Sequence, residues 1–551
     1  RAREFRLFFS GCGRCQPKRV CNVNVTLRHL PPPLRRRHDW KMAEVVATSP
    51  LVAPRPVRRW RADDFIKAFF GSNALIAIVV LGLITIFLFR EGFGFFGQNL
   101  RNIRLYRRAG LEYVDIMRDA ANAHAALSRG LNLTWKSAQT TESPETLARF
   151  DQFSTAFSDS ADDLNGLVSD AGEKAVALRD ALALQAGDVD RGGEKEGHAS
   201  AAPVDEAATI SALRANTATF AAISSTMAEK IRGLLKTPPI FENAKTKRVF
   251  DSWSKRVENY LAILPGTTKK LATWDTNAPV PAYRAVTGFL FGREWTTASF
   301  WQDWYGIIPL LVGSIMVSIV ALAIAVPFGV ASAIYVSEIA FPAEKQLIKP
   351  YVEFIAAIPS VVLGFFGIAV VGETIRQLSQ SRFFHWVGFF PISERLNVFT
   401  AGSLLALMAV PTIFTLAEDA LRNVPSGFKE ASYALGANRL QTIGRVIVPA
   451  SLSGIVSAVL LGLGRVIGET MVVLLCAGNR IAIPDFTQGL GAFFQPVHTM
   501  TGIIAQEMGE VVRGSIHYRA LFMVGLVLFA ITLAINYGAQ KLVQRYRMSI
   551  G

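Results

Sequence analysis

Six long apolar segments recur along the chain, and polar stretches separate them. A helix needs about 20 mostly apolar residues to cross the hydrocarbon core of a bilayer, so each segment is suited to one crossing. The pattern predicts an all-α polytopic membrane protein with about six transmembrane helices. The segments are Asn73–Phe89, Tyr305–Val336, Pro350–Gly372, Val398–Ala417, Ala450–Ala477 and Ala520–Tyr537.

The polar region 90–303, between the first two segments, has no long apolar run. Its stretches Leu111–Leu133 and Ala207–Leu235 are rich in residues that favour helix. Residues 187–204 have few apolar side chains and are expected to form a loop. A small helical domain is predicted, and a spacer or packing role is its simplest interpretation. Apolar positions three or four apart, as on one face of a helix, are Ile210, Leu213, Phe220, Ile223 and Met227.

The loop charges predict an orientation for these segments. With both termini in the cytoplasm, the short inner segments hold fourteen Lys and Arg residues, whereas the short outer loops hold six. Positive residues favour the cytoplasmic side, so this topology is preferred, and region 90–303 becomes an extracytoplasmic insertion. The expected organisation is a cytoplasmic N-terminal segment 42–72, a first span 73–89, the insertion 90–303, a transmembrane core 304–540 and a cytoplasmic tail 541–551.

Composition supports a membrane protein and sets the N-terminus apart. Only 18% of residues are charged and the mean hydropathy is +0.30, yet the net charge is +15. Residues 1–41 contain eleven Lys and Arg but two acidic residues, and the first Met is Met42. We expect 1–41 to be a non-native upstream or disordered segment. A basic signal or a nucleic-acid-binding tail is the alternative, although the rest of the chain suggests no nucleic-acid partner.

No catalytic or metal site is predicted. Cys12 and Cys15 resemble half of a zinc site, but no second ligand pair follows at a usable spacing. Cys476 stands alone in an apolar run and is expected to be a packed side chain. The chain has no G-x-x-x-x-G-K-[ST] phosphate loop, so ATP hydrolysis is expected in a separate partner subunit, and no cofactor is expected.

The loop between the fourth and fifth segments carries a motif with a fixed spacing. Glu430, Ala431 and Ser432 are followed by Gly436 and, further along, by Pro449. The residues before Gly436 favour a short helix, which a left-handed glycine can end. An ordinary helix–turn–helix between spans would be the simpler interpretation. The motif resembles the "EAA" loop of ABC importer permeases, with Ser432 in place of the second alanine, and the resemblance implies that this loop couples the spans to an ATPase.

Two opposite charges lie within the fifth segment. Arg465 and Glu469 are four residues apart, which would make them neighbours on one face of a helix. Charges at this depth are costly, so they face a protein interior or an aqueous path. The guanidinium could bind a passing oxyanion, and the carboxylate could weaken that grip. A structural ion pair is the alternative. Gly464 and Gly468 are spaced for close helix packing.

Several stretches together resemble the PstC type of phosphate transport permease. The matching stretches are Gly462–Met471, Tyr305–Leu311, Ile358–Gly367 and the loop that ends at Pro449. The resemblance implies a type I ABC importer permease core in a bacterial plasma (inner) membrane. It also implies partners, namely a sister permease of the PstA type, ABC ATPase subunits and an extracytoplasmic phosphate-binding protein. Arg465 and Glu469 match the intramembrane pair linked to phosphate passage in that family.

The sequence is also compatible with two other functions and contains further minor candidate sites. A permease for another oxyanion, such as molybdate or sulfate, would share the coupling loop, and a membrane sensor with 90–303 as its input domain is a more distant alternative. Pro359 and Ser360 are a possible cavity site, because a kink there would expose backbone groups. Glu418 and Asp419, at the end of the fourth segment, are expected to be solvated.

Overall fold

The computed structural model describes residues 62–139, 142–185, 205–297, 299–381, 383, 390–392 and 394–546. The predictions for residues 1–41, including the cysteines at positions 12, 15 and 21, and for the loop 187–204 lie outside these residues. Two compact units divide the chain after Asn73, and the boundary falls inside α1. In the first unit the structure describes only the beginning of α1, so the account below concerns residues 74–551.

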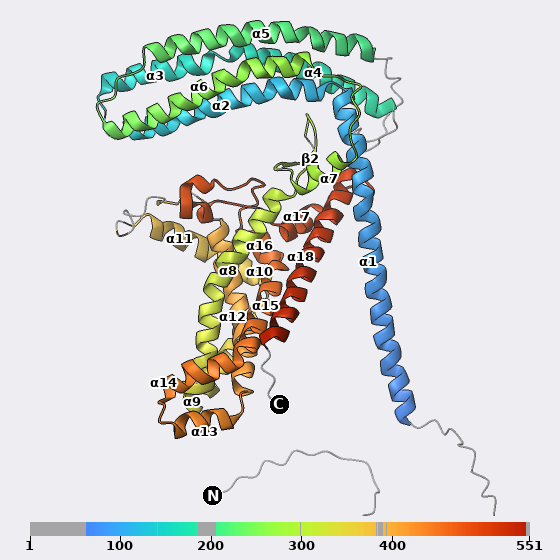
Figure 1. Ribbon diagram of the computed structural model, residues 1–551, viewed down its shortest axis with the longest axis vertical. Helices are drawn as coiled ribbons and strands as arrows, with labels where there is room; N and C mark the ends of the chain where they lie inside the picture. The colour runs from blue at the N-terminus through green and yellow to red at the C-terminus, as the bar shows by residue number, and fades with distance from the viewer. Residues whose placement is uncertain are drawn as a thin grey trace, which may run out of the picture. The chain divides into compact units, whose positions relative to one another are not determined.

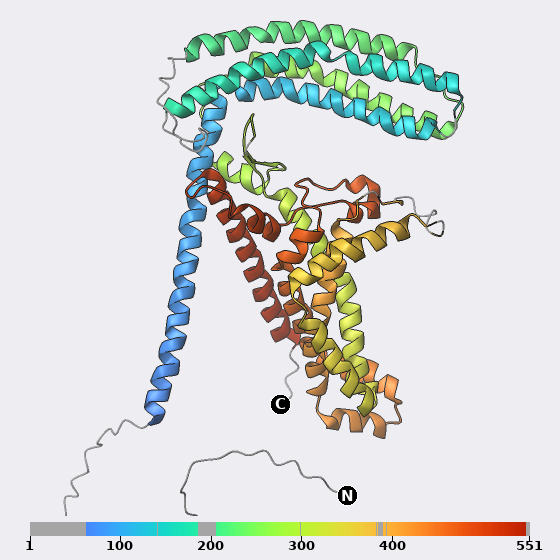
Figure 2. The same ribbon diagram turned by 180° about the vertical axis from the view of Figure 1, so that it is seen from behind.

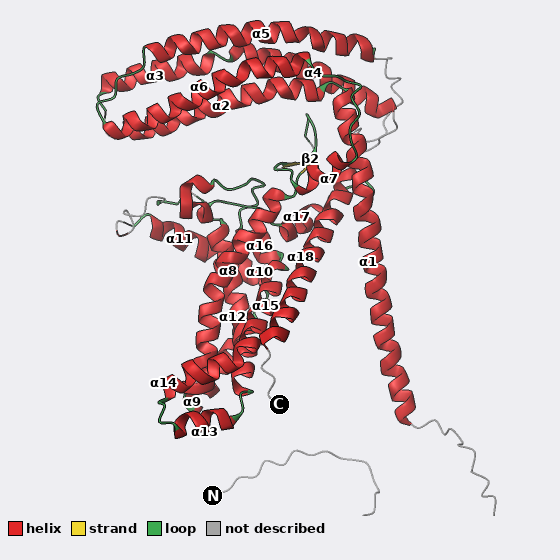
Figure 3. Ribbon diagram, in the orientation of Figure 1, coloured by secondary structure: helices red, strands yellow, loops and turns green. Residues whose placement is uncertain are grey.

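Helices account for nearly all of the regular structure that is described (Figure 3). One antiparallel pair of two-residue strands, β1 and β2, interrupts them. Short π-helical turns cover Tyr335–Ile339, Gly367–Val371 and Ile443–Ile447, and a 3₁₀ segment covers Phe486–Phe494. The helices and strands are α1 (Ala62–Arg108), α2 (Leu111–Ala138), α3 (Pro144–Asp159), α4 (Asp162–Gln185), α5 (Glu206–Lys236), α6 (Ala244–Ala272), α7 (Tyr283–Leu290), β1 (Trp295–Thr296), β2 (Trp304–Tyr305), α8 (Ile308–Ile334), α9 (Pro342–Ala356), α10 (Ser360–Phe366), α11 (Gly372–Ser379), α12 (Val398–Arg422), α13 (Ser426–Ala434), α14 (Arg439–Thr442), α15 (Val448–Ile467), α16 (Met471–Cys476), α17 (Met500–Glu507) and α18 (Ile516–Tyr546).

Six helical stretches among the described residues are long and apolar enough to cross a membrane. This confirms the predicted all-α polytopic class and its number of spans. The stretches are Phe65–Arg108, Ile308–Ile339, Ser360–Ser379, Val398–Arg422, Arg439–Ile467 and Ile516–Lys541.

Two of the predicted spans were wrong as continuous helices. Within Pro350–Gly372, α9 ends at Ala356 and a new helix, α10, begins at Ser360. Pro359 lacks a backbone N–H and disfavours helical geometry in the residue before it, which explains the break. Within Ala450–Ala477, α15 ends at Ile467 and α16 begins at Met471. Both breaks lie inside apolar runs, where hydropathy gives no sign of them.

The predicted transmembrane core is organised around α12, which packs against both α8 and α15 (Figure 1). Small residues line these contacts. Gly402 of α12 lies so close to α8 that a Cβ there would come within 2.6 Å of Val320. Close backbone approach of this kind is how helices associate in lipid, where apolar burial contributes little. Other buried small residues of this core are Ala321, Ala325, Ala401 and Ala409.

Helices α2–α6, residues 111–272, form a bundle of long helices side by side (Figures 1 and 2). Trp253 is fully buried in it, donates its indole N–H to the Leu127 carbonyl at 2.8 Å and meets Phe157 edge-on at 4.9 Å between ring centroids. The helical face predicted for α5 is present, because Ile210, Leu213, Phe220 and Met227 are buried and Ile223 packs against the same core.

Candidate functional site

The predicted Arg465–Glu469 pair lies at a break in the fifth span. The last turn of α15 closes with Gly468, whose N–H donates to the Gly464 carbonyl at 3.2 Å. Glu469 then falls in a short non-helical connection before α16. The expectation that the two charges share one face of a continuous helix was therefore wrong. Their spacing of four residues does not bring the side chains together once the helix has ended.

Arg465 faces the neighbouring span rather than a carboxylate. Its Nη1 donates to Thr412 Oγ1 of α12 at 3.1 Å, and its side chain is exposed. Within the described part of the chain, Arg465 has no ion pair with an acidic side chain. A guanidinium has five N–H donors, so most of them remain available to a ligand. The structure thus presents a positive charge on the α12–α15 side of the core.

Glu469 is held by the backbone of the break itself. Its Oε1 accepts a hydrogen bond from the Met471 N–H at 3.2 Å, at the first residue of α16. Its carbonyl accepts from the Thr501 hydroxyl at 2.8 Å. Thr501 lies in α17, so this connection is tied to a helix more than thirty residues away in the sequence. Glu469 therefore lies near Arg465 in the sequence, but its hydrogen bonds are with Met471 and Thr501.

The glycines around Arg465 differ in what approaches them. A Cβ at Gly464 would meet nothing within 4 Å, and at Gly468 it would meet only the backbone of its own helix. In contrast, a Cβ at Gly462 would come within 2.7 Å of Ile413 on α12. Gly454, eight residues earlier in α15, is tighter still, with a Cβ there 2.4 Å from Ala420. Helix packing at Gly464 and Gly468 stays a prediction, and Gly462 and Gly454 are the close contacts that sequence reasoning missed.

Pro359 and Ser360 lie at the start of α10, the short helix that packs against α16. The thiol of Cys476 donates to the Gly364 carbonyl at 3.3 Å. Cys476 is fully buried, as predicted for a packed side chain. These contacts place α10 beside the break that holds Glu469. A cavity at Pro359 and Ser360 stays a prediction.

The predicted coupling loop folds into two short helices, α13 and α14, between α12 and α15. Gly436 ends the first of them in a left-handed conformation, φ +82°, as the sequence predicts. Ser432 is buried and shares a hydrogen bond with the Thr442 hydroxyl at 2.9 Å, so the serine that replaces the second alanine joins α13 to α14. Pro449 lies in the first turn of α15, directly after the π-helical turn Ile443–Ile447.

One face of the loop is exposed and partly apolar. Glu430 and Ala431 are exposed on α13. Leu435 is 89% exposed, and other large apolar side chains accompany it. Exposed apolar groups of this kind mark contact surfaces. The accompanying residues are Phe428, Tyr433 and Leu440.

An ion pair that sequence reasoning missed ties this loop to the end of α8. Glu338, in the π-helical turn that follows α8, lies 2.7 Å from Lys429 Nζ of α13. The guanidinium of Arg439, on α14, donates to the Glu338 carbonyl. Glu338 is therefore bound by both helices of the loop. No local motif in the sequence marks it, because its partners are about 90 and 100 residues away.

The expectation that Glu418 is solvated was wrong. This residue of α12 is only 4% exposed, and its carboxylate lies 2.6 Å from Lys349 Nζ and 3.8 Å from Arg422 Nη1. A carboxylate at the end of a span can be buried when cations compensate its charge. Lys349 comes from α9, so the pair became visible only when α9 and α12 were packed together.

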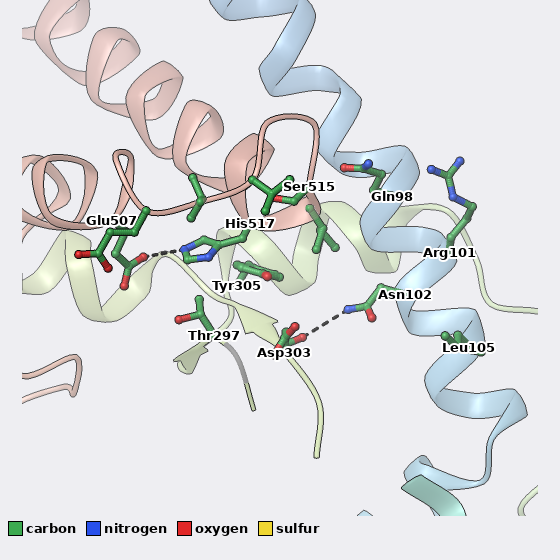
Figure 4. Close-up of a pocket in the computed structure, with 14 residues that line it drawn as sticks. Gln98, Arg101, Asn102, Leu105, Thr297, Asp303, Tyr305, Glu507, Ser515 and His517 are labelled. Atoms are coloured by element: carbon green, nitrogen blue, oxygen red, sulfur yellow. Dashed lines mark hydrogen bonds and ion pairs between the residues drawn. The ribbon is translucent and has the colours of Figure 1, made fainter. Parts of the chain in front are cut away.

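A cavity of about 410 Å³ is lined by residues of α1, of the segment around β1 and β2, and of the region from the end of α17 to the start of α18 (Figure 4). His517 Nε2 and a Glu507 carboxylate oxygen share a hydrogen bond of 2.7 Å on its wall, and the Asn102 side-chain amide donates to the Asp303 carbonyl at 3.4 Å. Its charged lining is of mixed sign, with Arg101 among three carboxylates. Such a lining does not select an anion. Among the described residues, no cluster of three His, Cys, Asp or Glu side chains could hold a metal.

Known proteins resemble the chain from α8 onward. A family model described as "Binding-protein-dependent transport system inner membrane component" matches residues 325–548. The probable ABC transporter permease protein YqgH of Bacillus subtilis is 36% identical over 41% of this chain and 68% of its own length. The phosphate transport system permease proteins PstC of Pasteurella multocida and Haemophilus influenzae are 31% and 32% identical, over 48% and 47% of this chain and 81% and 84% of theirs. The chain belongs to the family of binding-protein-dependent transport permeases of the PstC type.

Proposed function

We propose that this chain is the membrane permease subunit of an ATP-driven phosphate importer. It lies in the bacterial plasma membrane, crosses it six times and has both termini in the cytoplasm. It lines the translocation path together with a sister permease. Its relatives support the assignment, since two of them are phosphate transport permeases by name. The predominance of positive residues in the segments placed inside supports the orientation.

The observation that carries this proposal is the guanidinium of Arg465. It stands in a transmembrane helix, exposed in this chain, with the Thr412 hydroxyl as its hydrogen-bond partner. A charge inside a transmembrane helix costs up to about 2.5–3.5 kcal/mol at the helix centre on insertion scales, so Arg465 needs water or a ligand. Arg binds phosphate oxygens through two parallel N–H donors. The Thr412 hydroxyl can add a third hydrogen bond.

Glu469 would tune release of the anion. In this structure its carboxylate is occupied with the backbone N–H of Met471 and leaves Arg465 to a ligand. Because Glu469 lies in a helix break, a modest change at residues 468–470 would move it relative to Arg465. A carboxylate that approaches the guanidinium competes with the bound anion and lowers its affinity. The break is therefore the part of the path that we expect to change during transport.

The coupling loop would receive the ATPase subunit. Its exposed apolar residues, with Leu435 the most exposed, suit a protein partner. The bonds from Glu338 to Lys429 and Arg439 would then carry movement of the loop into α8. A phosphate-binding protein would deliver the anion on the extracytoplasmic side of the membrane. The bundle α2–α6 would lie on that side as an insertion with a spacer or packing role.

The test is phosphate uptake by Arg465→Ala in the assembled transporter. Uptake should fall at least a hundredfold while the complex remains intact in the membrane, because the main anion ligand is gone. Arg465→Lys should recover only part of it, since an ammonium lacks the planar fork. Arg480→Ala is the matched control, because Arg480 is exposed and lies outside the spans. Normal uptake by Arg465→Ala would refute the role of this residue.

Substrate choice is tested by competition. Radiolabelled phosphate uptake by the wild-type transporter should be unaffected by a large excess of sulfate or molybdate. If either anion competes as well as unlabelled phosphate does, the chain serves another oxyanion or several. Copurification of an ATPase and a binding protein from native membranes tests the proposed partners. A kinase in their place would favour a sensor.

A further inference from the structure

A second basic site lies at the coupling-loop end of the core, apart from the path around Arg465. An open depression of about 520 Å³ is lined there by residues from the turn after α8, from α9 and from the end of α12. Its polar lining comprises Ser337, Lys345, Gln346, Lys349, Glu418 and Arg422. Neither the proposed anion path nor the proposed ATPase contact uses this depression.

The charge of the depression is positive on its open side. It has three cations and one carboxylate. The carboxylate of Glu418 is buried behind Lys349, at 2.6 Å, whereas the Arg422 side chain is 63% exposed. Lys345 Nζ uses one donor on the Ser337 carbonyl at 2.9 Å and has two others. Because three cations face a single carboxylate, the site carries a net positive charge and favours an anionic group.

An apolar surface lies next to these charges on α9. Leu347, Tyr351 and Phe354 recur at helical spacing and are 74%, 66% and 67% exposed. Ile348 and Val352, on another face of α9, pack into the core. Pro350 lines the depression and lies on the helix surface between the lysines and the apolar stripe. A molecule with an anionic head and apolar tails could therefore occupy both surfaces at once.

The depth of the site also fits a lipid. Two spans, Ile308–Ile339 and Val398–Arg422, end at this depression, so it lies where the hydrocarbon core gives way to the polar layer. Basic pockets between helices at this level bind anionic headgroups, and long cationic side chains extend toward them. Inorganic phosphate shares the headgroup's charge, but it has no chains and would leave the apolar stripe exposed.

We propose that this depression, which we name the α9–α12 site, binds the phosphate headgroup of an anionic phospholipid whose acyl chains lie along Leu347, Tyr351 and Phe354. The bound lipid would also act on the coupling loop. Ser337 lines the site, and its hydroxyl donates to Glu338 Oε1 at 3.0 Å, next to the contact with Lys429. This proposal concerns lipid binding and does not depend on which anion the chain transports.

The experiment measures lipid preference in the assembled transporter in nanodiscs. Spin-labelled phosphatidylglycerol is titrated against spin-labelled phosphatidylcholine in a zwitterionic bilayer. The variant K345Q/R422Q removes two of the three cations and keeps the close Lys349–Glu418 pair, so the buried carboxylate is not left without a partner. The control R445Q/K541Q removes two exposed cations elsewhere in the chain. The preference for phosphatidylglycerol should fall about tenfold or more in K345Q/R422Q and stay unchanged in the control.

Three outcomes would overturn the proposal. Equal binding of the two lipids by the wild type would show that no anionic lipid site exists, or that a partner subunit covers it. An equal loss of preference in both variants would show a general charge effect. Displacement of phosphatidylglycerol by millimolar inorganic phosphate would identify a free-phosphate site. Each readout is independent of uptake, so failure here is distinguishable from failure of the proposed transport function.

Discussion

The bundle α2–α6 and the permease core α8–α18 are both all-helical, yet different residues pack them. The bundle buries large aromatic side chains, Trp253 and Phe157 among them. The core brings α8, α12 and α15 together through glycine and alanine, as at Gly402 and Gly462. In water, burying a large apolar group drives association, whereas lipid offers no such gain and rewards close backbone contact. Large-to-small substitutions should therefore destabilise the bundle, and small-to-large substitutions should destabilise the core.

Charges show a second contrast between the two regions. In the bundle, charged side chains lie mostly on the helix surfaces, where water solvates them. In the core several charges have specific partners, such as Lys349 for Glu418 and Lys429 for Glu338, and Arg465 faces a neighbouring span. Loss of a partnered core charge should lower transport activity more than stability. Such a charge holds a neighbouring helix in position, whereas a solvated charge holds nothing.

The largest expected stability effect is in the bundle. Trp253→Ala should cost about 3–5 kcal/mol of the bundle's unfolding free energy, since it leaves a cavity and removes the hydrogen bond from the indole N–H to the Leu127 carbonyl. Hydrogen exchange of α6 peptides in the full chain measures this cost. Ile240→Ala, at an exposed position between α5 and α6, is the control and should lie within about 0.5 kcal/mol of wild type. Equal protection in the two variants would contradict the aromatic-core account.

In the core, the corresponding loss of stability should come from replacing a small residue by a larger one. Gly462→Ala places a Cβ 2.7 Å from Ile413 and should destabilise the core by about 1–3 kcal/mol. Gly464→Ala, two residues away, meets nothing in this chain and is the natural control. Thermal unfolding of the chain in detergent compares the two. If Gly462→Ala and Gly464→Ala lower the unfolding temperature equally, close packing at Gly462 does not account for the loss of stability.

Coupling should weaken when Glu338 loses its charge. Glu338→Gln removes the ion pair with Lys429, and phosphate uptake should fall about tenfold while ATP hydrolysis continues, because the loop no longer moves with α8. A tenfold change corresponds to about 1.4 kcal/mol. Glu353→Gln changes an exposed carboxylate on α9 and should leave both rates as they are. Parallel loss of uptake and hydrolysis in Glu338→Gln would point to misassembly instead.

The smallest effect expected is a pH dependence of the bundle. Burial lowers the pKa of His124 below its usual 6.5, and the ring stacks on Phe157. The unfolded chain then binds the proton more readily, so the bundle loses stability as the pH falls below about 6.5. Hydrogen exchange of α2 and α3, corrected for intrinsic rates, should show weaker protection at low pH. His124→Phe keeps an aromatic ring there and should flatten this dependence. A variant with the wild-type slope would assign it to other groups.

The sequence by itself determined the number of spans and the short helix that precedes Gly436. The length of an apolar run decides whether it can cross a bilayer as a helix. That length is read directly from consecutive residues in the sequence. The spacing from Glu430 to Pro449 located the loop, and Gly436 ended α13 where a left-handed residue was expected. The buried face of α5 was also predicted, since a period of 3.6 residues is a local property.

Only the tertiary structure decided where those helices stop and which charges meet. The break at 468–470 separates Glu469 from Arg465, and its partner Thr501 lies on a distant helix. Glu338 finds its partners about 90 and 100 residues away, and the burial of Glu418 depends on α9. Ion pairs and close glycine contacts depend on what another helix brings to the same point in space, and a one-dimensional pattern does not contain that information.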